Sequence, residues 1–307
     1  DADAAIRALD GLFGTAFNSA RFDDAEWASN QLIEMGKKQQ NIGALVLGTQ
    51  FLGMCSFSRG RLKLAESYLT EALTHRTNAD AVGSDFPSMS LIYLSWTLQL
   101  LGDEQKALAL YLTAQAEARQ ETDYRLAACL GNGCILMALR HDTGMLEAMV
   151  EELIPLAKRN GFQLWLNMAL FFQGWMQVMT RQQTSGLLQM CHVCDNMGEQ
   201  EIDKTCYLGI LAESYLRMGR IPEASQTVDQ ALALAGRTGE NYYTAELLRL
   251  RGELSATVDR SEARAALEKS ADIAREQGAK TWQLRTQQTL ASLISTPATS
   301  PQDIPRC

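Results

Sequence analysis

The chain has 307 residues and a net charge of −8, and it lacks the clustered Lys and Arg that a nucleic-acid or anionic-membrane surface needs. No apolar stretch reaches the roughly eighteen residues of a membrane-spanning helix, and no apolar leader is evident. Seven dispersed cysteines, mostly on apolar helical faces, favour a reducing, cytoplasmic location. Because the chain starts at Asp1 rather than Met, we expect it to be part of a longer protein.

The apolar periodicity predicts a succession of paired helices along the chain. The expected pairs are 4–20 with 23–39, 42–58 with 62–76, 88–101 with 104–121, 123–140 with 144–159, 162–180 with 184–197, two helices within 206–234, and 242–257 with 261–277. A last helix is expected at 281–294. The break at 78–87 reads as an ordered loop, and the Pro-rich segment 295–307 as a disordered tail or linker.

One position in the second helix of every pair recurs along the chain. It is occupied by Ala25, Ala65, Ala107, Leu146, Gly186, Ala224 and Ala263, which are 38 to 42 residues apart. A period near forty is typical of a solenoid of helical hairpins, whose units cannot bury their apolar faces alone. The sequence therefore predicts an all-α, right-handed superhelix of about seven hairpins plus a terminal helix over residues 1–294.

No group of residues indicates catalysis or a resident metal. The motif Cys191-His192-Val193-Cys194 lacks the second pair that a structural zinc site needs, so two ordinary helix cysteines are the preferred interpretation. Gly131-Asn132-Gly133 lies inside a helical pattern, where close helix packing is favoured over a phosphate cradle. We expect no enzyme activity, no cofactor and no metal.

The first helices of several pairs carry a second apolar face, directed away from their own hairpin. We predict that this face forms the concave wall of the superhelix and binds a ligand or partner through Gln50, Met54, Phe57, Met89, Ile92, Trp96, Gln99, Met168, Phe171, Trp175 and Glu213. The same aromatic residues could instead fill the packing between repeats, and this alternative stays open. As a groove the wall would run about 30 Å, which suits an amphipathic helix or extended peptide better than a small metabolite.

The hairpins resemble tetratricopeptide repeats, in which small residues such as Ala212 and Ala224 and an aromatic residue such as Tyr215 recur at helix crossings. Residues 89–293 more specifically resemble the helical C-terminal region of bacterial signal-transduction ATPases. Those proteins are fused to class III adenylate cyclases or to winged-helix and LuxR-type transcription regulators. The similar segments are 91–108, 157–175, 208–224, 236–254 and 274–293.

This resemblance implies a regulatory, protein-binding superhelix beside an ATPase or regulator module of the same polypeptide. It would bind a peptide, a partner helix or an effector, without nucleic acid or membrane as its own partner. The alternative is a homo-oligomerisation scaffold that uses its edges and has no ligand in the groove. An enzyme is the remaining alternative, and it would need converging polar groups in one pocket.

Overall fold

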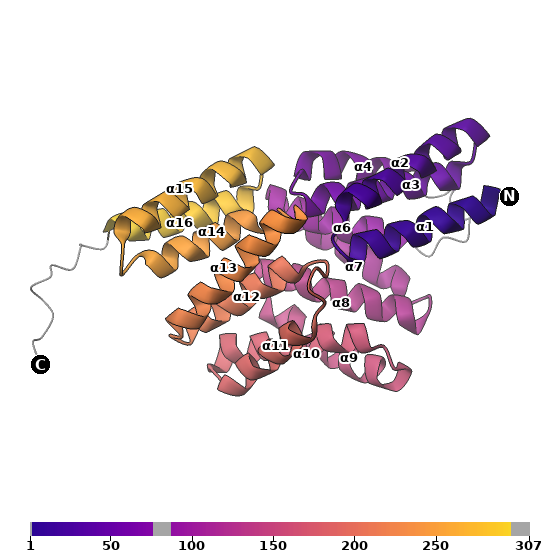
Figure 1. The fold of residues 1–307 in the computed structure, drawn as a ribbon. Coiled ribbons are helices and arrows are strands. Elements are labelled where there is room, and N and C mark those ends of the chain that lie inside the picture. The colour runs from indigo at the N-terminus through magenta and orange to yellow at the C-terminus, as the bar shows by residue number, and fades with distance from the viewer. Residues whose placement is uncertain (1, 76–86, 296–307) are drawn as a thin grey trace, which may run out of the picture.

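The computed structural model describes residues 2–75 and 87–295, in which every regular element is an α-helix (Figure 1). In chain order the helices are α1 (Ala2–Asn18), α2 (Phe22–Gln39), α3 (Ile42–Ser58), α4 (Leu62–Thr74), α6 (Pro87–Leu101), α7 (Glu104–Ala118), α8 (Asp123–Arg140), α9 (Thr143–Asn160), α10 (Gln163–Arg181), α11 (Thr184–Asn196), α12 (Lys204–Arg217), α13 (Ile221–Thr238), α14 (Thr244–Ser255), α15 (Arg260–Gln277) and α16 (Lys280–Ser295).

These helices confirm the predicted α-solenoid. The two helices of each predicted pair form a hairpin in the structure, which gives seven hairpins from α1–α2 to α14–α15. The expected last helix is α16. The loop expected at 78–87 and the tail expected at 295–307 lie outside the described residues, apart from Pro87 and Ser295, which belong to α6 and α16.

The recurring small position lies where the two helices of each hairpin cross. Its alanines, from Ala25 to Ala263, are completely buried, and so is Leu146. In the degenerate fifth hairpin, a Cβ atom added to Gly186 would lie only 2.4 Å from the carbonyl oxygen of Gly174 in the facing helix. Two glycines therefore provide the close approach that an alanine provides in five of the other copies.

Short polar connections join the helices. The carboxylates of Asp103 and Asp142 accept hydrogen bonds from backbone N–H groups in the first turns of α7 and α9, which are otherwise without partners. Within two other hairpins the chain reverses at Gly60 and Gly219, both in the left-handed region of backbone space that favours glycine. The turn chemistry thus fixes the hairpins locally, before any contact between distant repeats.

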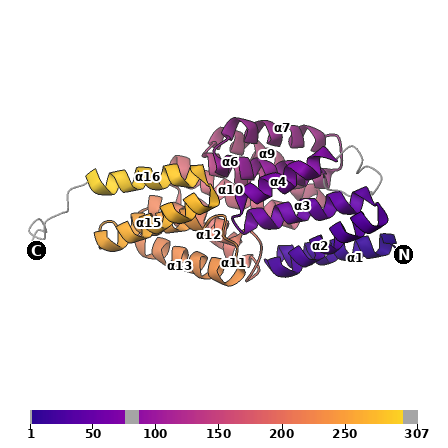
Figure 2. The same cartoon turned by 90° about the horizontal axis from the view of Figure 1, so that it is seen from above.

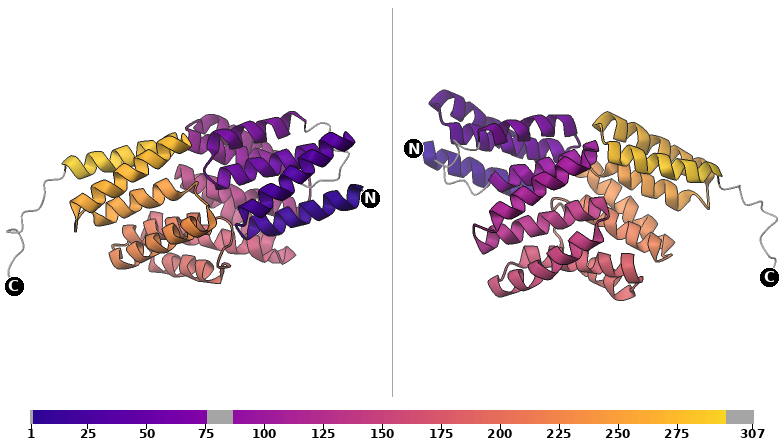
Figure 3. Two further views of the ribbon diagram at one scale, coloured as in Figure 1. Left: turned by 45° about the horizontal axis from the view of Figure 1, so that its top comes forward. Right: turned by 180° about the vertical axis from the view of Figure 1, so that it is seen from behind.

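The superhelix curves so tightly that its C-terminal hairpins return to its N-terminal ones. Figures 1 and 3 show α14–α16 beside the N-terminal hairpins, with α9–α11 on the opposite side of the molecule, and Figure 2 shows α16 reaching α6. The Thr281 hydroxyl donates to the carbonyl oxygen of Gln99 at 2.5 Å, and the Arg285 guanidinium donates to that of Leu139 at 2.7 Å. The backbone N–H of Asn241 donates to the carbonyl oxygen of Ser58 at 2.8 Å.

Candidate functional site

Most of the predicted concave wall is packed inside the molecule. The ring of Phe57 lies 5.6 Å from that of Trp96 and 4.6 Å from that of Tyr242, which comes from the connection between α13 and α14. Because the returning C-terminal hairpins supply Tyr242 and α16, they cover the inner faces of α3 and α6. The apolar strip therefore faces other repeats, as the packing alternative describes.

The structure places the predicted wall residues in three different environments. Phe57, Ile92, Trp96, Phe171 and Trp175 are buried among other side chains, as are Gln50 and Gln99, whose amide oxygens accept hydrogen bonds from Ser90 and Arg140. Met54, Met89 and Met168 line one cavity, and Glu213 lines another. The expected open groove of about 30 Å is thus occupied by the protein's own side chains.

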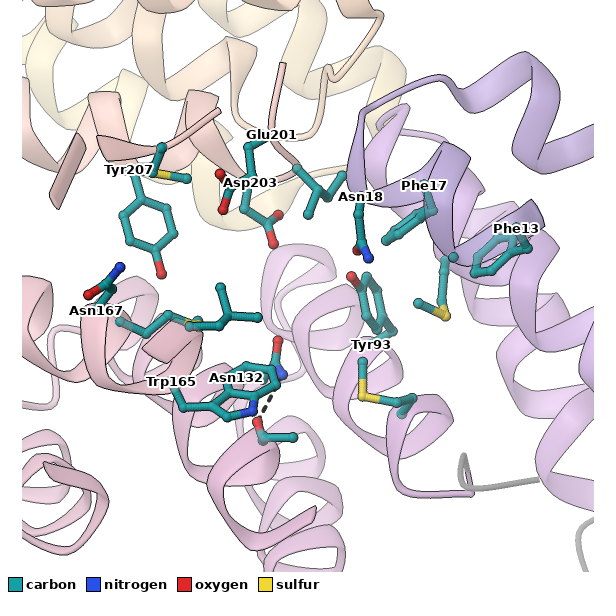
Figure 4. A pocket seen from close by; sticks show the side chains of 18 of the residues that line it. Phe13, Phe17, Asn18, Tyr93, Asn132, Trp165, Asn167, Glu201, Asp203 and Tyr207 are labelled. Carbon is teal, nitrogen blue, oxygen red and sulfur yellow. Dashed lines mark hydrogen bonds between the residues drawn. The ribbon is translucent and has the colours of Figure 1, made fainter. Parts of the chain in front are cut away.

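The first cavity has a volume of about 390 Å³ and lies inside the superhelix (Figure 4). Its walls come from α1, α3, α6, α8, α10, α11 and α12, and from the connection 197–203 between α11 and α12. This size falls within the range of small-molecule sites. The lining residues extend along the sequence from Asp10 to Tyr207. No local sequence pattern could therefore have indicated the cavity.

Aromatic rings form much of its wall. Phe13 and Phe51 stack with their centroids 3.6 Å apart, and Phe17 meets Tyr93 edge-on at 6.1 Å. The hydroxyls of Tyr93 and Tyr207 point toward the cavity from opposite sides in Figure 4. Both tyrosines are 3% exposed, and neither hydroxyl has a hydrogen-bond partner among the described residues. Buried phenols usually find a partner, so these two groups are available to a ligand.

The connection 197–203 closes one side of the cavity and is held at several points. The backbone N–H of Ile202 donates to the carbonyl oxygen of Asn18 at 3.0 Å, which ties the C-terminal half to the end of α1. The Lys204 ammonium donates to the carbonyl oxygens of Met197 and Gly198. Asp203 adopts a positive φ of 64°, and its N–H donates to the buried carboxylate of Glu240 at 2.7 Å.

Asp203 and Glu240 form a pair of buried acids at this wall. The Asp203 carboxylate accepts a hydrogen bond from the Tyr242 hydroxyl at 2.8 Å, and Glu240 accepts one from the Thr205 hydroxyl at 2.5 Å. Burial raises the pKa of both carboxyls, and the nearby charge of Asp203 raises that of Glu240 further. Glu201 also lines the cavity and raises the pKa of Asp203.

The second cavity, of about 440 Å³, lies between α12, α14, α15 and α16 and carries charges of both signs. Next to it Glu246 is 1% exposed and bonded to the guanidinium groups of Arg249 at 2.9 Å and Arg285 at 3.2 Å. Burial opposes its charged form, but the two arginines outweigh that effect and lower the pKa of Glu246 to about 2. Burial likewise raises the pKa of Glu213, the predicted wall residue in this cavity.

Each of the two motifs identified in the sequence contributes one residue to the first cavity, Asn132 from the glycine motif and Val193 from the cysteine motif. Cys191 contacts the Tyr215 hydroxyl at 2.9 Å, Cys194 is buried, and no group of metal-binding side chains occurs within residues 2–75 and 87–295. Gly131 packs against Trp165 and Gly133 against Tyr111, as the close-packing interpretation expected. Sequence reasoning missed Tyr93, Tyr207 and Asp203. The acidic connection 197–203, the longest connection described in full, was the available signal.

No protein-family profile matches the sequence, and neither does any curated protein. Among solved structures, the chain is similar to the crystal structure of a tetratricopeptide repeat protein from Parabacteroides merdae ATCC 43184. The two sequences are 16% identical, the match covers 92% of this chain and 99% of that chain, and the TM-score is 0.48. In the described part of the chain, none of the helices is both long and apolar enough to cross a bilayer.

Proposed function

We propose that this solenoid is a non-catalytic regulatory domain that recognises its ligand in the central cavity. The observation that supports this most is the origin of the cavity wall, which combines the N-terminal helices α1, α3 and α6 with α10–α12 and the connection 197–203. A ligand there contacts both halves at once. It therefore changes the free energy of the closed superhelix relative to more open ones, which a neighbouring domain can sense.

The sequence resemblance supports a signal-transduction ATPase or transcription regulator as the protein to which this domain belongs. Within that proposal, the ligand is an effector or a short peptide segment, because the interior is already filled where a long helix would have to lie. Reading the coding region on either side of this sequence for an ATPase module tests the attachment independently of the cavity.

A matched pair of glycine variants tests the cavity. An added Cβ at Gly14 in α1, which lines the cavity, meets no atom within 4 Å, and the same holds for Gly236 in α13, which lies on the outer surface. Gly14→Phe should therefore place its ring in the cavity from a position with room for its Cβ atom, and Gly236→Phe should leave the cavity open. Both variants and the wild type are screened by melting temperature against one mixed library of cationic, neutral and anionic small molecules and capped tripeptides.

We expect some compounds to raise the melting temperature of the wild type and of Gly236→Phe, but not that of Gly14→Phe. Stabilisation by a bound ligand follows from mass action, and at a hundredfold excess over Kd it is about 2.7 kcal/mol. If every active compound stabilises all three proteins equally, or if none is active, the central cavity is not the binding site.

A further inference from the structure

The charges around the central cavity are of one sign. Asp10, Glu201 and Asp203 line it, whereas no Lys, Arg or His is among its described wall residues. Lys204, the nearest cation along the connection, uses its ammonium group on two backbone carbonyl oxygens. A concave, low-dielectric site with carboxylates alone focuses a negative potential, which attracts cations and repels anions.

Two of these carboxylates form no ion pair within the part of the chain that the structure describes. Glu201 accepts the backbone N–H of Gly198 at 2.7 Å, and Asp203 accepts the Tyr242 hydroxyl, but neither has an ion-pair partner among the described residues. Asp203 is 8% exposed. A buried carboxylate without a counter-charge is costly, so its site is electrostatically incomplete as the protein alone builds it.

Neutral acceptors and aromatic faces lie in the same wall, beside one buried donor without a partner among the described residues, the indole N–H of Trp165. The amide nitrogen of Asn132 donates to the carbonyl oxygen of Ala128 at 2.8 Å, which leaves the amide oxygen facing the cavity (Figure 4). The hydroxyl oxygens of Tyr93 and Tyr207 can also accept. An ammonium group carries three donors and no acceptor, and it is attracted to aromatic faces within about 6 Å.

We propose that the central cavity binds a small organic cation, an amine with an apolar or aromatic body, whose charged group lies against Asp203. The apolar body packs against the rings of α1 and α3, where Phe13 and Phe51 stack. The ammonium group has two N–H donors left after its bond to Asp203, and the cavity offers acceptors for them in the phenols of Tyr93 and Tyr207 and the amide oxygen of Asn132. This inference rests on the proposed function of the cavity and adds the chemical class of its ligand.

Three probes of the same shape and different charge test the inference on the full chain. They are phenethylammonium, 2-phenylethanol and phenylacetate, titrated by calorimetry at pH 8, where the Asp203 carboxyl is ionised. We expect phenethylammonium to bind at least tenfold more tightly than the alcohol, and phenylacetate not to bind. Equal affinity for cation and alcohol, or preference for the anion, overturns the inference.

Substitution at the carboxylate gives the second arm. Asp203→Asn keeps an oxygen that can accept the Tyr242 hydroxyl, so it removes charge with little change of shape. It should weaken phenethylammonium binding at least tenfold and leave the affinity for the alcohol unchanged. Glu199→Gln, which changes an exposed carboxylate in the same connection, is the matched control and should bind like the wild type. Equal losses in both variants would mean that only the general negative field attracts the cation, and the proposed site would be wrong.

A third arm separates the source of the cation and separates this inference from the proposed function. A capped glycine-lysine-glycine peptide that binds while phenethylammonium does not would assign the cavity to a partner's lysine and overturn the small-molecule ligand. Library compounds that are sensitive to Gly14→Phe but neutral or anionic would overturn the cation and leave the proposed function standing. The absence of any Gly14→Phe-sensitive compound would overturn both.

Discussion

Two buried glutamates near the start of α14 have opposite electrostatic environments. Glu246 lies between Arg249 and Arg285, whereas Glu240 is hydrogen-bonded to Thr205 and to backbone N–H groups and has the acid Asp203 beside it. Both side chains are 1% exposed, so burial is the same. Because burial is equal, the difference in pKa comes from the neighbouring charges. A buried glutamate with an arginine partner is ionised, whereas one beside another acid stays protonated.

The largest effect is expected from removing the charge of the paired glutamate. Glu246→Gln leaves Arg249 and Arg285 in the interior without their shared anion, and this should lower the free energy of unfolding by about 3–5 kcal/mol at pH 7. Urea denaturation with a constant m-value measures it.

The matched control is Glu240→Gln. Its carboxyl already favours the protonated form, and the Thr205 hydroxyl can reverse its role and accept from the new amide, so the cost should be about 1 kcal/mol. Similar losses in the two variants would contradict the contrast between the two sites.

The second effect is a pH dependence of opposite sign at the two sites. Burial first, and then the charge of Asp203, raises the pKa of Glu240 from 4.5 to about 8, so its contribution to stability is complete below pH 4.5 and is lost as the pH rises to about 8. The pKa of Glu246 is lowered to about 2, so its contribution is present above pH 4.5 and is lost as the pH falls toward 2.

Denaturation curves between pH 5 and 9 separate the two contributions. The stability of the wild type relative to Glu240→Gln should fall across this range, while its stability relative to Glu246→Gln should stay level. A level difference for Glu240→Gln would mean that its carboxyl is ionised in the folded protein at neutral pH.

The smallest effect belongs to an ion pair at the surface. Arg264 and Glu268 face solvent on α15, with side-chain exposures of 73% and 55%. Water screens such a pair, so Arg264→Ala should leave the urea midpoint unchanged within experimental error. A clear loss of stability in this variant would show that exposed ion pairs also stabilise the protein. Burial would then not explain the large effect expected at Glu246.

The sequence predicted the hairpins well, because their determinants are local. A residue at the helix crossing, small in six of the seven hairpins, and a turn residue such as Gly219 or Asp142 recur from repeat to repeat. Every recurring position is buried as the repeat pattern requires. The predicted wall residues stay a prediction as a binding surface, since Trp96 is buried among other rings and Met168 lines the central cavity.

What covers that wall was not predictable from one sequence. Phe57 packs on Tyr242, and Gln99 receives the Thr281 hydroxyl, through contacts that depend on the small rotation from each repeat to the next. These small rotations add up along the seven hairpins and set the curvature of the superhelix. The cavity shares this origin, because Tyr93 and Asp203 meet in it only after the superhelix has closed.

The bonds from Ser58 to Asn241 and from Gln99 to Thr281 also change how such a chain unfolds. In an open array of repeats, each repeat contacts only the next repeats along the chain, so the terminal repeats can unfold alone. These bonds make the C-terminal units neighbours of the second and third hairpins, so loss of the last unit also removes contacts from repeats far away in the sequence. The mean sequence separation of contacts rises as well, which slows folding and makes the transition more nearly all-or-none than the repeat pattern suggests.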